Sequence, residues 1–566
     1  MSENGSARRF DVAIIGGGLS GSMLGAILAK QGVSVVIIEE DVHPRFEVGE
    51  STTPHTSLLI SLLAERLGLP EIEHIAYPER LPEHLPPTSG LKRFFGFVYH
   101  REGQTYDPRE GFQIGTNSKD ENHWFRQDID AYLFHLAVQY GAVAMQRTNV
   151  TSVDIDQQGV TIRTDEGAEI HARYVVDGTG YRSILARRFG LRENPTPLKH
   201  HSRTLFTHMV RVPAFQGENH QMSLSWHLST LHHCFERGWF WVIPFNNHAR
   251  SVNPLISVGL TIDPRRYPRA GASPEQEFQK FLKMFPSVGE QFADARAVRP
   301  WVSTGRLQYS SKRCTGYRYC LMSHAYGFID PLFSRGMTNT VEIISALIEP
   351  LLNSLATDNF DEEAYKHIDR LQRRVLSYND NLVNGSFISW ADFGVWNAWL
   401  RVWALGTILA EFRLMNALSE YTKTRDEQQL KPVAREPIFS DFEDPDYAAF
   451  FKQAVEWIEA FEAGRLSASE TEKKIFGHTE DYEFPVTIGR EAFQRAGWLK
   501  PGQQMRDNNF DLVRRSYRWA ITNPDTHDLF GRFETLCRWA THRSDPLVTG
   551  VPQVAVEQVN TMKEAS

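Results

Sequence analysis

The stretch Asp11-Val-Ala-Ile-Ile-Gly-Gly-Gly-Leu-Ser-Gly21 carries the strongest structural signal in the chain. Its apolar residues 12–15 have the composition of a strand buried on both faces, and Gly16 to Gly21 fits the pattern G-x-G-x-x-G. This pattern predicts a strand, a tight turn and a helix whose N-terminus can hold a pyrophosphate through free N–H groups and its dipole. A second β-branched run ends at Glu39, eighteen residues after Gly21, where a carboxylate can bond ribose hydroxyls.

The unit therefore predicts a doubly wound, Rossmann-like domain that binds a dinucleotide. A Gly-rich loop in some other α/β protein is the competing interpretation, but the two flanking strands and the acid at the expected spacing argue against it. The sequence shows no second Gly-rich strand–helix unit that could serve NAD(P)H. The residues assigned to the cofactor are Gly16, Gly18, Leu19, Ser20, Gly21 and Glu39.

The composition of the 566-residue chain is that of an ordinary globular protein, with 41% apolar, 12% aromatic and 23% charged residues. Its 61 basic and 69 acidic residues leave a formal net charge of −8, which argues against a nucleic-acid-binding surface. Four cysteines without a CxxC pair exclude a disulfide scaffold and predict a reduced, cytoplasmic protein. The apolar residues 395–415 include Arg401, Glu411 and Arg413, so we expect no membrane span.

Three further stretches extend the pattern beyond the first turn. Arg126 opens a predicted helix, Asp177 ends an apolar strand in Tyr174-Val-Val-Asp-Gly178, and Asp330 lies in Gly327-Phe-Ile-Asp-Pro-Leu-Phe-Ser-Arg-Gly336. The order of these motifs resembles the FAD-dependent aromatic-hydroxylase superfamily, in which segments of a substrate domain interrupt one FAD domain. The resemblance implies FAD as the dinucleotide and an α/β fold, α+β overall.

The resemblance also implies a division of the chain. We expect an FAD-binding core over residues 8–375, interrupted by substrate β-sheet segments at about 85–125 and 195–300, and a mainly helical region over residues 376–566.

Two more motifs narrow the chemistry. Gly238-Trp-Phe-Trp-Val-Ile-Pro244 fits W-x-W-x-I-P, and Ser89-Gly-Leu-Lys-Arg-Phe-Phe-Gly-Phe97 places Lys92 in an aromatic, apolar stretch. With the loop that ends at Gly336, they make the chain similar to the flavin-dependent halogenases, and most similar to the pyrrole-type branch of that family.

The resemblance implies a halogenation route that uses FADH2, oxygen, and chloride or bromide. In the family, halide attacks a flavin hydroperoxide, and the resulting hypohalous acid travels inside the protein to a lysine beside the substrate. The resemblance implies that Lys92 is that lysine, since its spacing to Phe97 matches the family's. Burial among apolar groups would disfavour its ammonium form and leave an amine that can hold or accept the halogen. A surface lysine beside Arg93 is the competing interpretation. Without a nicotinamide site, the enzyme would need a separate flavin reductase.

Other roles are carried over from the family residue by residue. Trp239 and Trp241, at i and i+2 on one strand, would face the same way and separate flavin from substrate; plain core packing is the alternative. The family's halide site corresponds to Arg335 and Gly336, and its substrate pocket to Phe97 and Phe333. The further flavin-contact candidates are Glu50, Ser51, Arg126, Asp177 and Asp330.

One difference from the tryptophan-halogenating branch of the family indicates the expected substrate. The tryptophan-halogenating branch has a glutamate where this chain has Phe333, and phenylalanine cannot orient an ammonium. The substrate is therefore expected to be an electron-rich ring that activates itself, a pyrrole or a phenol of secondary metabolism, free or tethered to a carrier protein. The alternatives are a flavin monooxygenase or reductase without halogenation, and a non-catalytic flavin-binding module.

In the helical region, Trp390, Trp396 and Trp403 recur at helical spacing and predict an amphipathic helix whose Trp-rich face is core or a wall of the substrate pocket. We predict no metal site, because metal-ligand spacing is absent around the pairs His200-His201 and His232-His233.

Overall fold

The apolar runs on either side of the Gly-rich turn form adjacent parallel strands, β1 (Arg9–Ile15) and β2 (Val35–Ile38), with Val12 beside Val35. On its other side β1 pairs in parallel with β10 (Glu169–Asp177), so that β1 is a central, buried strand. The computed structural model describes residues 9–115, 120–215, 224–430 and 445–481.

The first sheet has the order β17–β18–β10–β1–β2–β7, and β9 and β8 are attached through β10. Helices α1 and α5 pack together, and α1 also contacts α10. The expected doubly wound α/β arrangement is confirmed. The remaining strands are β7 (Val143–Met145), β8 (Val150–Ile155), β9 (Val160–Thr164), β17 (Thr315–Gly316) and β18 (Tyr319–Leu321).

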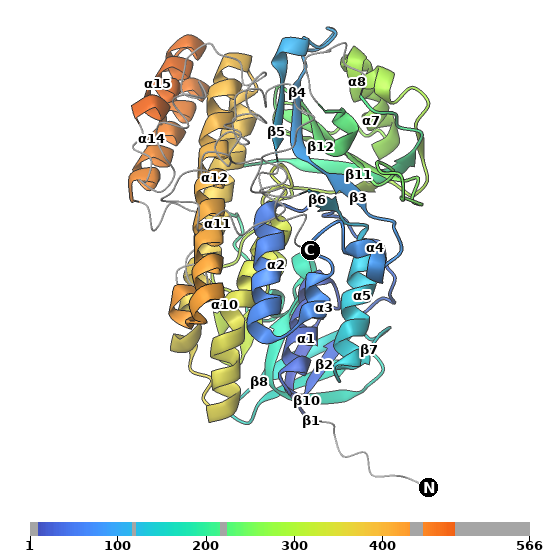
Figure 1. Cartoon of the computed structure of the whole chain (residues 1–566), viewed down its shortest axis with the longest axis vertical. Helices are drawn as coiled ribbons and strands as arrows, with labels where there is room; N and C mark the ends of the chain where they lie inside the picture. The colour runs from blue at the N-terminus through green and yellow to red at the C-terminus, as the bar shows by residue number, and fades with distance from the viewer. Residues whose placement is uncertain (1–8, 116–119, 216–223, 431–444, 482–566) are drawn as a thin grey trace, which may run out of the picture.

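The second sheet has the order β15–β11–β14–β13–β12–β4–β5, with β16 also on β11, and it lies above the first sheet in Figure 1. One face packs on α7 and α8 around Phe240 and Phe281, and the other carries Trp239 and Trp241 toward the core of the cofactor domain. Its strands are β4 (Phe94–Tyr99), β5 (Gly111–Gly115), β11 (Arg203–Val210), β12 (Ser229–Phe235), β13 (Gly238–Pro244), β14 (Ile256–Ile262), β15 (Arg296–Ala297) and β16 (Val302–Ser303). A separate two-stranded ribbon joins β3 (Gly90–Lys92) and β6 (Glu121–His123).

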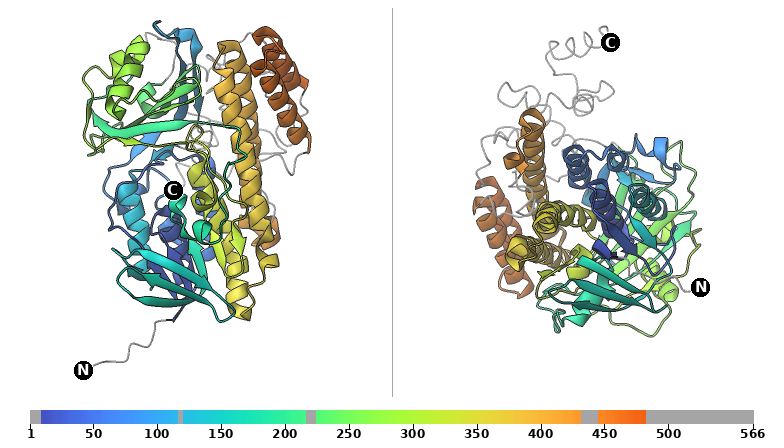
Figure 2. Two further views of the ribbon diagram at one scale, coloured as in Figure 1. Left: turned by 180° about the vertical axis from the view of Figure 1, so that it is seen from behind. Right: turned by 90° about the horizontal axis from the view of Figure 1, so that it is seen from below.

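Long helices run along one side of both sheets (Figures 1 and 2). Helix α11 continues through residue 375, so the boundary that we place there falls inside a helix, and the division into 8–375 and 376–566 stays a prediction. The described part of the second region is helical, and residues 482–566 lie outside the described residues. In the described residues, no helix combines the length and apolarity needed to cross a bilayer.

The predicted Trp-rich helix needs one correction. Trp390 follows the last residue of α11 and is not on the helix that carries Trp396 and Trp403, because the chain turns at Ala391 and Asp392 before α12 begins. The helices are α1 (Leu19–Lys30), α2 (Pro54–Leu67), α3 (Pro70–Glu73), α4 (Leu81–His84), α5 (Arg126–Gln139), α6 (Ile184–Arg188), α7 (Pro274–Met284), α8 (Pro286–Gln291), α9 (Ser323–Tyr326), α10 (Gly336–Thr357), α11 (Lys366–Ser389), α12 (Phe393–Thr424), α14 (Pro445–Glu462) and α15 (Ala468–Asp481).

Candidate active site

The turn between β1 and α1 forms a cradle of bare backbone. Gly16 has φ +98°, a conformation that favours glycine, and a Cβ on Gly16 would lie 2.9 Å from the carbonyl carbon of Gly178. A Cβ on Gly18 would lie 2.6 Å from Nη2 of Arg45, and one on Gly21 would collide with the carbonyl oxygen of Gly16. Helix α1 starts at Leu19 without a capping side chain from the described residues, so its N-terminus is available to an anion. These features fit a pyrophosphate.

Glu39 lies at the end of β2, directly against this cradle. Its Oε2 accepts a hydrogen bond from the backbone N–H of Gly17 at 2.6 Å, and the residue is buried. Ser20 faces the turn after β10, since a Cβ on Gly178 would lie 3.1 Å from Ser20 Oγ. The structure thus brings the predicted glycines, Ser20 and Glu39 to one edge of the sheet, where a dinucleotide can lie.

A strap over residues 43–54 connects the cofactor domain to the second sheet. The guanidinium of Arg126 donates to the carbonyls of Val48 and Gly49 at 2.8 and 3.1 Å, and it also pairs with both oxygens of Asp130 at 2.7 and 2.9 Å. At the next residue of the strap, Glu50 contacts Nε2 of a buried histidine on β11, His208, at 2.8 Å. The strap is therefore clamped at two points by the predicted residues Arg126 and Glu50.

Removal of the Arg126 clamp gives a testable prediction. The side chains of Arg126 and Asp130 are 8% and 0% exposed, and breaking such a pair leaves an uncompensated buried carboxylate. We expect Arg126→Met to lower the free energy of unfolding by about 3–5 kcal/mol in denaturant titrations. Arg163→Met, which breaks a solvent-exposed pair with Asp154, is the matched control and should leave stability unchanged. Equal effects of the two substitutions would contradict the clamp.

Asp177 organises the turn that follows β10 with both carboxylate oxygens. One oxygen accepts from the N–H and hydroxyl of Thr179, at 3.0 and 2.6 Å, and the other accepts from Ser183 Oγ and the N–H of Leu185, at 2.7 and 3.0 Å. The carboxylate shapes the turn that backs Gly16, and a direct cofactor contact stays a prediction.

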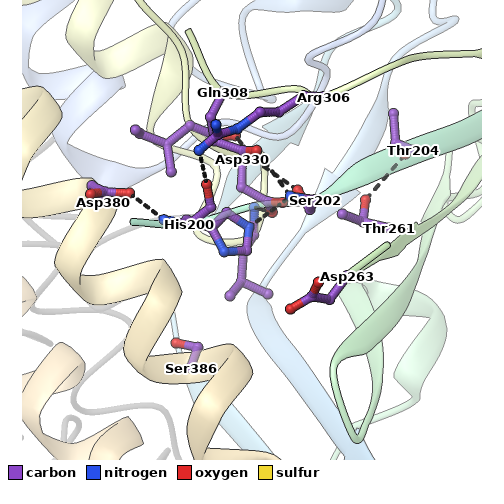
Figure 3. A network of polar contacts seen from close by, with 12 residues as sticks. His200, Ser202, Thr204, Thr261, Asp263, Arg306, Gln308, Asp330, Asp380 and Ser386 are labelled. Atoms are coloured by element: carbon purple, nitrogen blue, oxygen red, sulfur yellow. Dashed lines mark hydrogen bonds and ion pairs between the residues drawn. The ribbon is translucent and has the colours of Figure 1, made fainter. Parts of the chain in front are cut away.

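Asp330 has a similar anchoring position, shown in Figure 3. Its carboxylate accepts from Ser202 Oγ at 2.8 Å and from the N–H of Leu332 at 3.1 Å, and it lies 3.3 Å from Nε2 of His200. Asp380 of α11 in turn accepts from the backbone N–H of His200 at 2.9 Å. The network ties the loop 330–336 to the segment before β11 and to α11.

Lys92 ends β3 and is completely buried. Its Nζ donates to Ser51 Oγ at 2.9 Å and to the carbonyl oxygen of Thr52 at 2.7 Å, and it lies 3.5 Å from the centre of the Phe95 ring. Burial lowers the pKa of the Lys92 ammonium well below its usual value, although the nearby Glu121 carboxyl opposes the shift. The side chain is therefore held in a buried chamber between Ser51, Thr52 and the Phe95 ring, where burial favours the neutral amine over the ammonium.

Ser51 is the point at which three segments meet. Its hydroxyl contacts Lys92, Thr230 Oγ1 on β12 at 2.6 Å, and the hydroxyl of Ser334 at 3.0 Å. Ser334 has φ +55°, a left-handed conformation that is uncommon outside glycine and aims its side chain at the strap. The sequence did not single out Thr230 or Ser334 for this role. Nothing in the local sequence indicates that either residue meets Ser51.

Trp239 and Trp241 share the face of β13 that looks toward the cofactor domain, with ring centroids 5.7 Å apart. The indole N–H of Trp241 donates to Ser257 Oγ at 3.2 Å, and its ring lies where a side chain at position 259 would be, so Gly259 leaves room for it. His232 on the neighbouring strand packs against Trp239, with the ring centroids 5.1 Å apart. The two indoles form a buried aromatic layer, and His232 connects it to the Phe95 ring beside Lys92.

The predicted pocket residues Phe97 and Phe333 lie near each other, with centroids 6.4 Å apart. Helix α12 adds two tryptophans to the cluster. Trp403 stacks on Phe333 with ring centroids 4.8 Å apart, and Trp396 packs edge-on against Phe97 with centroids 5.7 Å apart. Trp399 points the other way and donates to the carbonyl of Leu382 in α11. Trp396 and Trp403 therefore lie beside the predicted pocket residues, whereas Trp399 packs α12 against α11.

The halide candidates lie where the loop 330–336 enters α10. Arg335 is the residue before the helix and Gly336 is its first residue, so N–H groups of the first turn are available to an anion. The guanidinium of Arg335 stacks over Tyr378 of α11 at 4.9 Å, and burial lowers its pKa. A cavity of about 40 Å³, lined in part by His324, Arg335 and Gly336, adjoins this turn and can hold a water molecule or a small ion.

The cradle, the acid at the end of β2 and the strap define the class of site: a dinucleotide site of the FAD-binding type. A family model described as "FAD binding domain" matches residues 9–280. The chain is 45% identical to the monodechloroaminopyrrolnitrin halogenase of Pseudomonas fluorescens, over 84% of this chain and 86% of the relative. It is 40% identical to the tetracycline 7-halogenase of Kitasatospora aureofaciens, over 98% of this chain and 96% of the relative.

A solved structure gives the same result. The halogenase PltM in complex with phloroglucinol and FAD superimposes with a TM-score of 0.82 at 31% identity, covering 88% of this chain and 99% of that one. The chain belongs to the flavin-dependent halogenase family, whose chemistry uses FAD, halide and oxygen.

Proposed function

We propose that this enzyme installs chlorine or bromine on a pyrrole or phenol ring and that Lys92 delivers the halogen. The observation that carries the proposal is the fully buried Lys92 amine, which Ser51 and Thr52 hold over the Phe95 ring. A buried amine of lowered pKa can hydrogen-bond hypohalous acid or accept its halogen, and either route places an electrophilic halogen at one point beside the substrate.

The cofactor would be held by the cradle from Gly16 to Gly21, with Glu39 toward the ribose and the strap over the flavin. Bound reduced FAD supplies, with oxygen, the oxidising equivalents that turn halide into hypohalous acid. The backbone at Arg335 and Gly336 would present the halide, and the aromatic layer of Trp239 and Trp241 would keep the substrate from the flavin. Hypohalous acid is small enough to pass where the ring cannot, so the separation favours halogenation over direct oxygen transfer.

The proposed substrate class follows from the aromatic cluster around Phe97, Phe333, Trp396 and Trp403. These rings favour a flat aromatic molecule, and Phe333 provides no carboxylate to activate it. The relatives support the choice: one is named for a monodechloroaminopyrrolnitrin substrate, and PltM was solved with the phenol phloroglucinol.

A product screen tests the substrate class. The purified enzyme, a flavin reductase, NADH, oxygen and bromide should be offered aryl-pyrroles and phenols, each free and as a thioester on a carrier protein. We expect brominated products from at least one of these rings by mass spectrometry, and only when bromide and the reductase are both present. Oxygenated products that form equally well without bromide would instead support a monooxygenase.

The dependence on the reductase is also part of the proposal. The sequence has one dinucleotide fingerprint, so reduced flavin must come from another protein. We expect no turnover with NADH alone and full turnover when a reductase or chemically reduced FAD is supplied. Turnover with NADH alone would overturn this point.

A further inference from the structure

A second buried ionisable group lies beside Lys92, and the sequence motifs did not mark it. In the two-stranded ribbon, Lys92 of β3 is directly opposite Glu121 of β6. Residues that face each other in an antiparallel pair project to the same side of the ribbon, so the two side chains share one environment. Glu121 is 1% exposed, and Lys92 is 0% exposed.

Thr52 bridges the two groups. The hydroxyl of Thr52 donates to Oε2 of Glu121 at 2.6 Å, while its carbonyl oxygen accepts from Lys92 Nζ at 2.7 Å. Ser57 on α2 gives the same carboxylate oxygen a second hydrogen bond at 2.8 Å. Glu121 therefore fixes the backbone segment that orients the Lys92 amine.

The electrostatics of the two groups are linked. Burial raises the pKa of the Glu121 carboxyl well above its usual value, while the hydrogen bonds from Thr52 and Ser57 and the charge of Lys92 oppose the shift. Burial lowers the pKa of Lys92, and Glu121 opposes that shift. A buried carboxylate and a buried ammonium each cost free energy, and each charge lowers the cost of the other. The two groups therefore titrate as a pair.

We propose that Glu121 is a positioning residue for Lys92, and that the pair holds a single proton which can reside on either group. With the proton on the carboxyl, Lys92 is a neutral amine that can accept a halogen; with the proton on the amine, Lys92 is an ammonium that can donate a hydrogen bond. The net charge of the pair is zero in both forms. Phe333 has no carboxylate that could orient Lys92. In this proposal Glu121 on β6 provides that carboxylate instead.

Other ionisable groups face this pair from the surrounding elements. Glu411 of α12 and Tyr77 interact electrostatically with Glu121, while His123 of β6 and His232 of β12 interact with Lys92. Burial lowers the pKa of both histidines to about 3, so they stay neutral near neutral pH. Glu411 disfavours the ionised form of Glu121 and so supports a protonated carboxyl.

Infrared difference spectroscopy tests the shared proton without any turnover. The spectrum of the intact FAD-loaded enzyme minus that of Glu121→Gln should contain the C=O band of a protonated carboxylic acid at neutral pH. In Lys92→Met the band should persist to higher pH, because the ammonium that favours the carboxylate is gone. Ser57→Ala should also move the titration to higher pH. A missing band, or a titration that neither substitution moves, would overturn the proposal.

Kinetics test the consequence for halogenation, which rests on the proposed role of Lys92. Glu121→Gln should lower kcat about tenfold, because without the carboxylate Lys92 is held as a neutral amine and loses the ammonium form that donates a hydrogen bond; a tenfold change in that form corresponds to one pKa unit. The KM for the aromatic substrate should stay the same, and one limb of the pH–rate profile should disappear. The matched control is Asp120→Asn, the neighbouring carboxylate, which pairs with Arg93 and should leave the profile unchanged.

The two assays separate the possible failures. If Lys92→Ala still halogenates, the role of Lys92 is wrong whatever the infrared spectra show. If Lys92→Ala is inactive but Glu121→Gln keeps the parental kcat and both pH limbs, the role of Lys92 stands and the role of Glu121 is wrong.

Discussion

Replacement of Lys92 by alanine is expected to reduce halogenation by about 10²- to 10⁴-fold, the usual contribution of a directly acting side chain. The reason is that the buried amine is the group that holds the halogen beside the aromatic cluster. Flavin binding and the oxidation of reduced flavin should continue, because Lys92 lies on β3 and not in the Gly-rich cradle. Product by mass spectrometry and flavin reoxidation by absorbance give the two readouts.

Arg93→Ala is the matched control for Lys92→Ala. Arg93 is the next residue, and it pairs with Asp120 in a partly exposed position outside the lysine chamber. It should halogenate at the parental rate. Product formed by Lys92→Ala at that same rate, with free hypohalous acid removed by a scavenger, would show that the assignment of Lys92 is wrong.

The second large effect is expected at Gly21. An alanine methyl group there would collide with the backbone carbonyl of Gly16 and lie 3.0 Å from Cγ2 of Ile14. The turn must open to relieve the collision, which costs about 1–3 kcal/mol of stability and moves the N–H groups away from the pyrophosphate. We expect Gly21→Ala to purify without the yellow colour of FAD, measured by the flavin absorbance per protein.

Gly305→Ala serves as the control for Gly21→Ala, because no described atom lies within 4 Å of a Cβ at Gly305. It should retain full FAD occupancy and parental stability. Full FAD occupancy in Gly21→Ala would contradict the assignment of the cradle.

Local sequence patterns were sufficient for the cofactor half of the molecule. The turn from Gly16 to Gly21 and the acid Glu39 lie within one strand–helix–strand unit, so their spacing alone predicts their meeting. Trp239 and Trp241 also share a face because of strand periodicity. The α/β fold was predicted correctly for this reason, whereas the family was predicted from its resemblance in the W-x-W-x-I-P motif, the stretch around Lys92 and the loop that ends at Gly336.

The lysine chamber could not be predicted in the same way. Ser51, Lys92, Thr230 and Ser334 come from four distant segments, and only the tertiary fold brings their side chains together. Glu121 was missed because its position opposite Lys92 depends on a pairing of two three-residue strands that no local pattern marks.

Asp177 and Asp330 are residues that the sequence did single out, but whose motif does not specify what the carboxylate contacts. Both were predicted to contact the flavin from family motifs, and both have carboxylates that accept hydrogen bonds from their own or neighbouring loops. A motif identifies a residue that the site needs, but it does not distinguish a ligand contact from the support of a loop, because both place a carboxylate beside the site.

The central claim is that the oxidant stays inside the protein until it reaches Lys92. A competition experiment tests it most directly: reduced FAD, oxygen and bromide are supplied with the aromatic substrate and an excess of monochlorodimedone, which captures free hypobromous acid. The parental enzyme should brominate the aromatic ring at one position despite the scavenger, and Lys92→Ala should brominate only the scavenger. If both proteins divide bromine between ring and scavenger in the same ratio, the oxidant acts in bulk solution and the account is wrong.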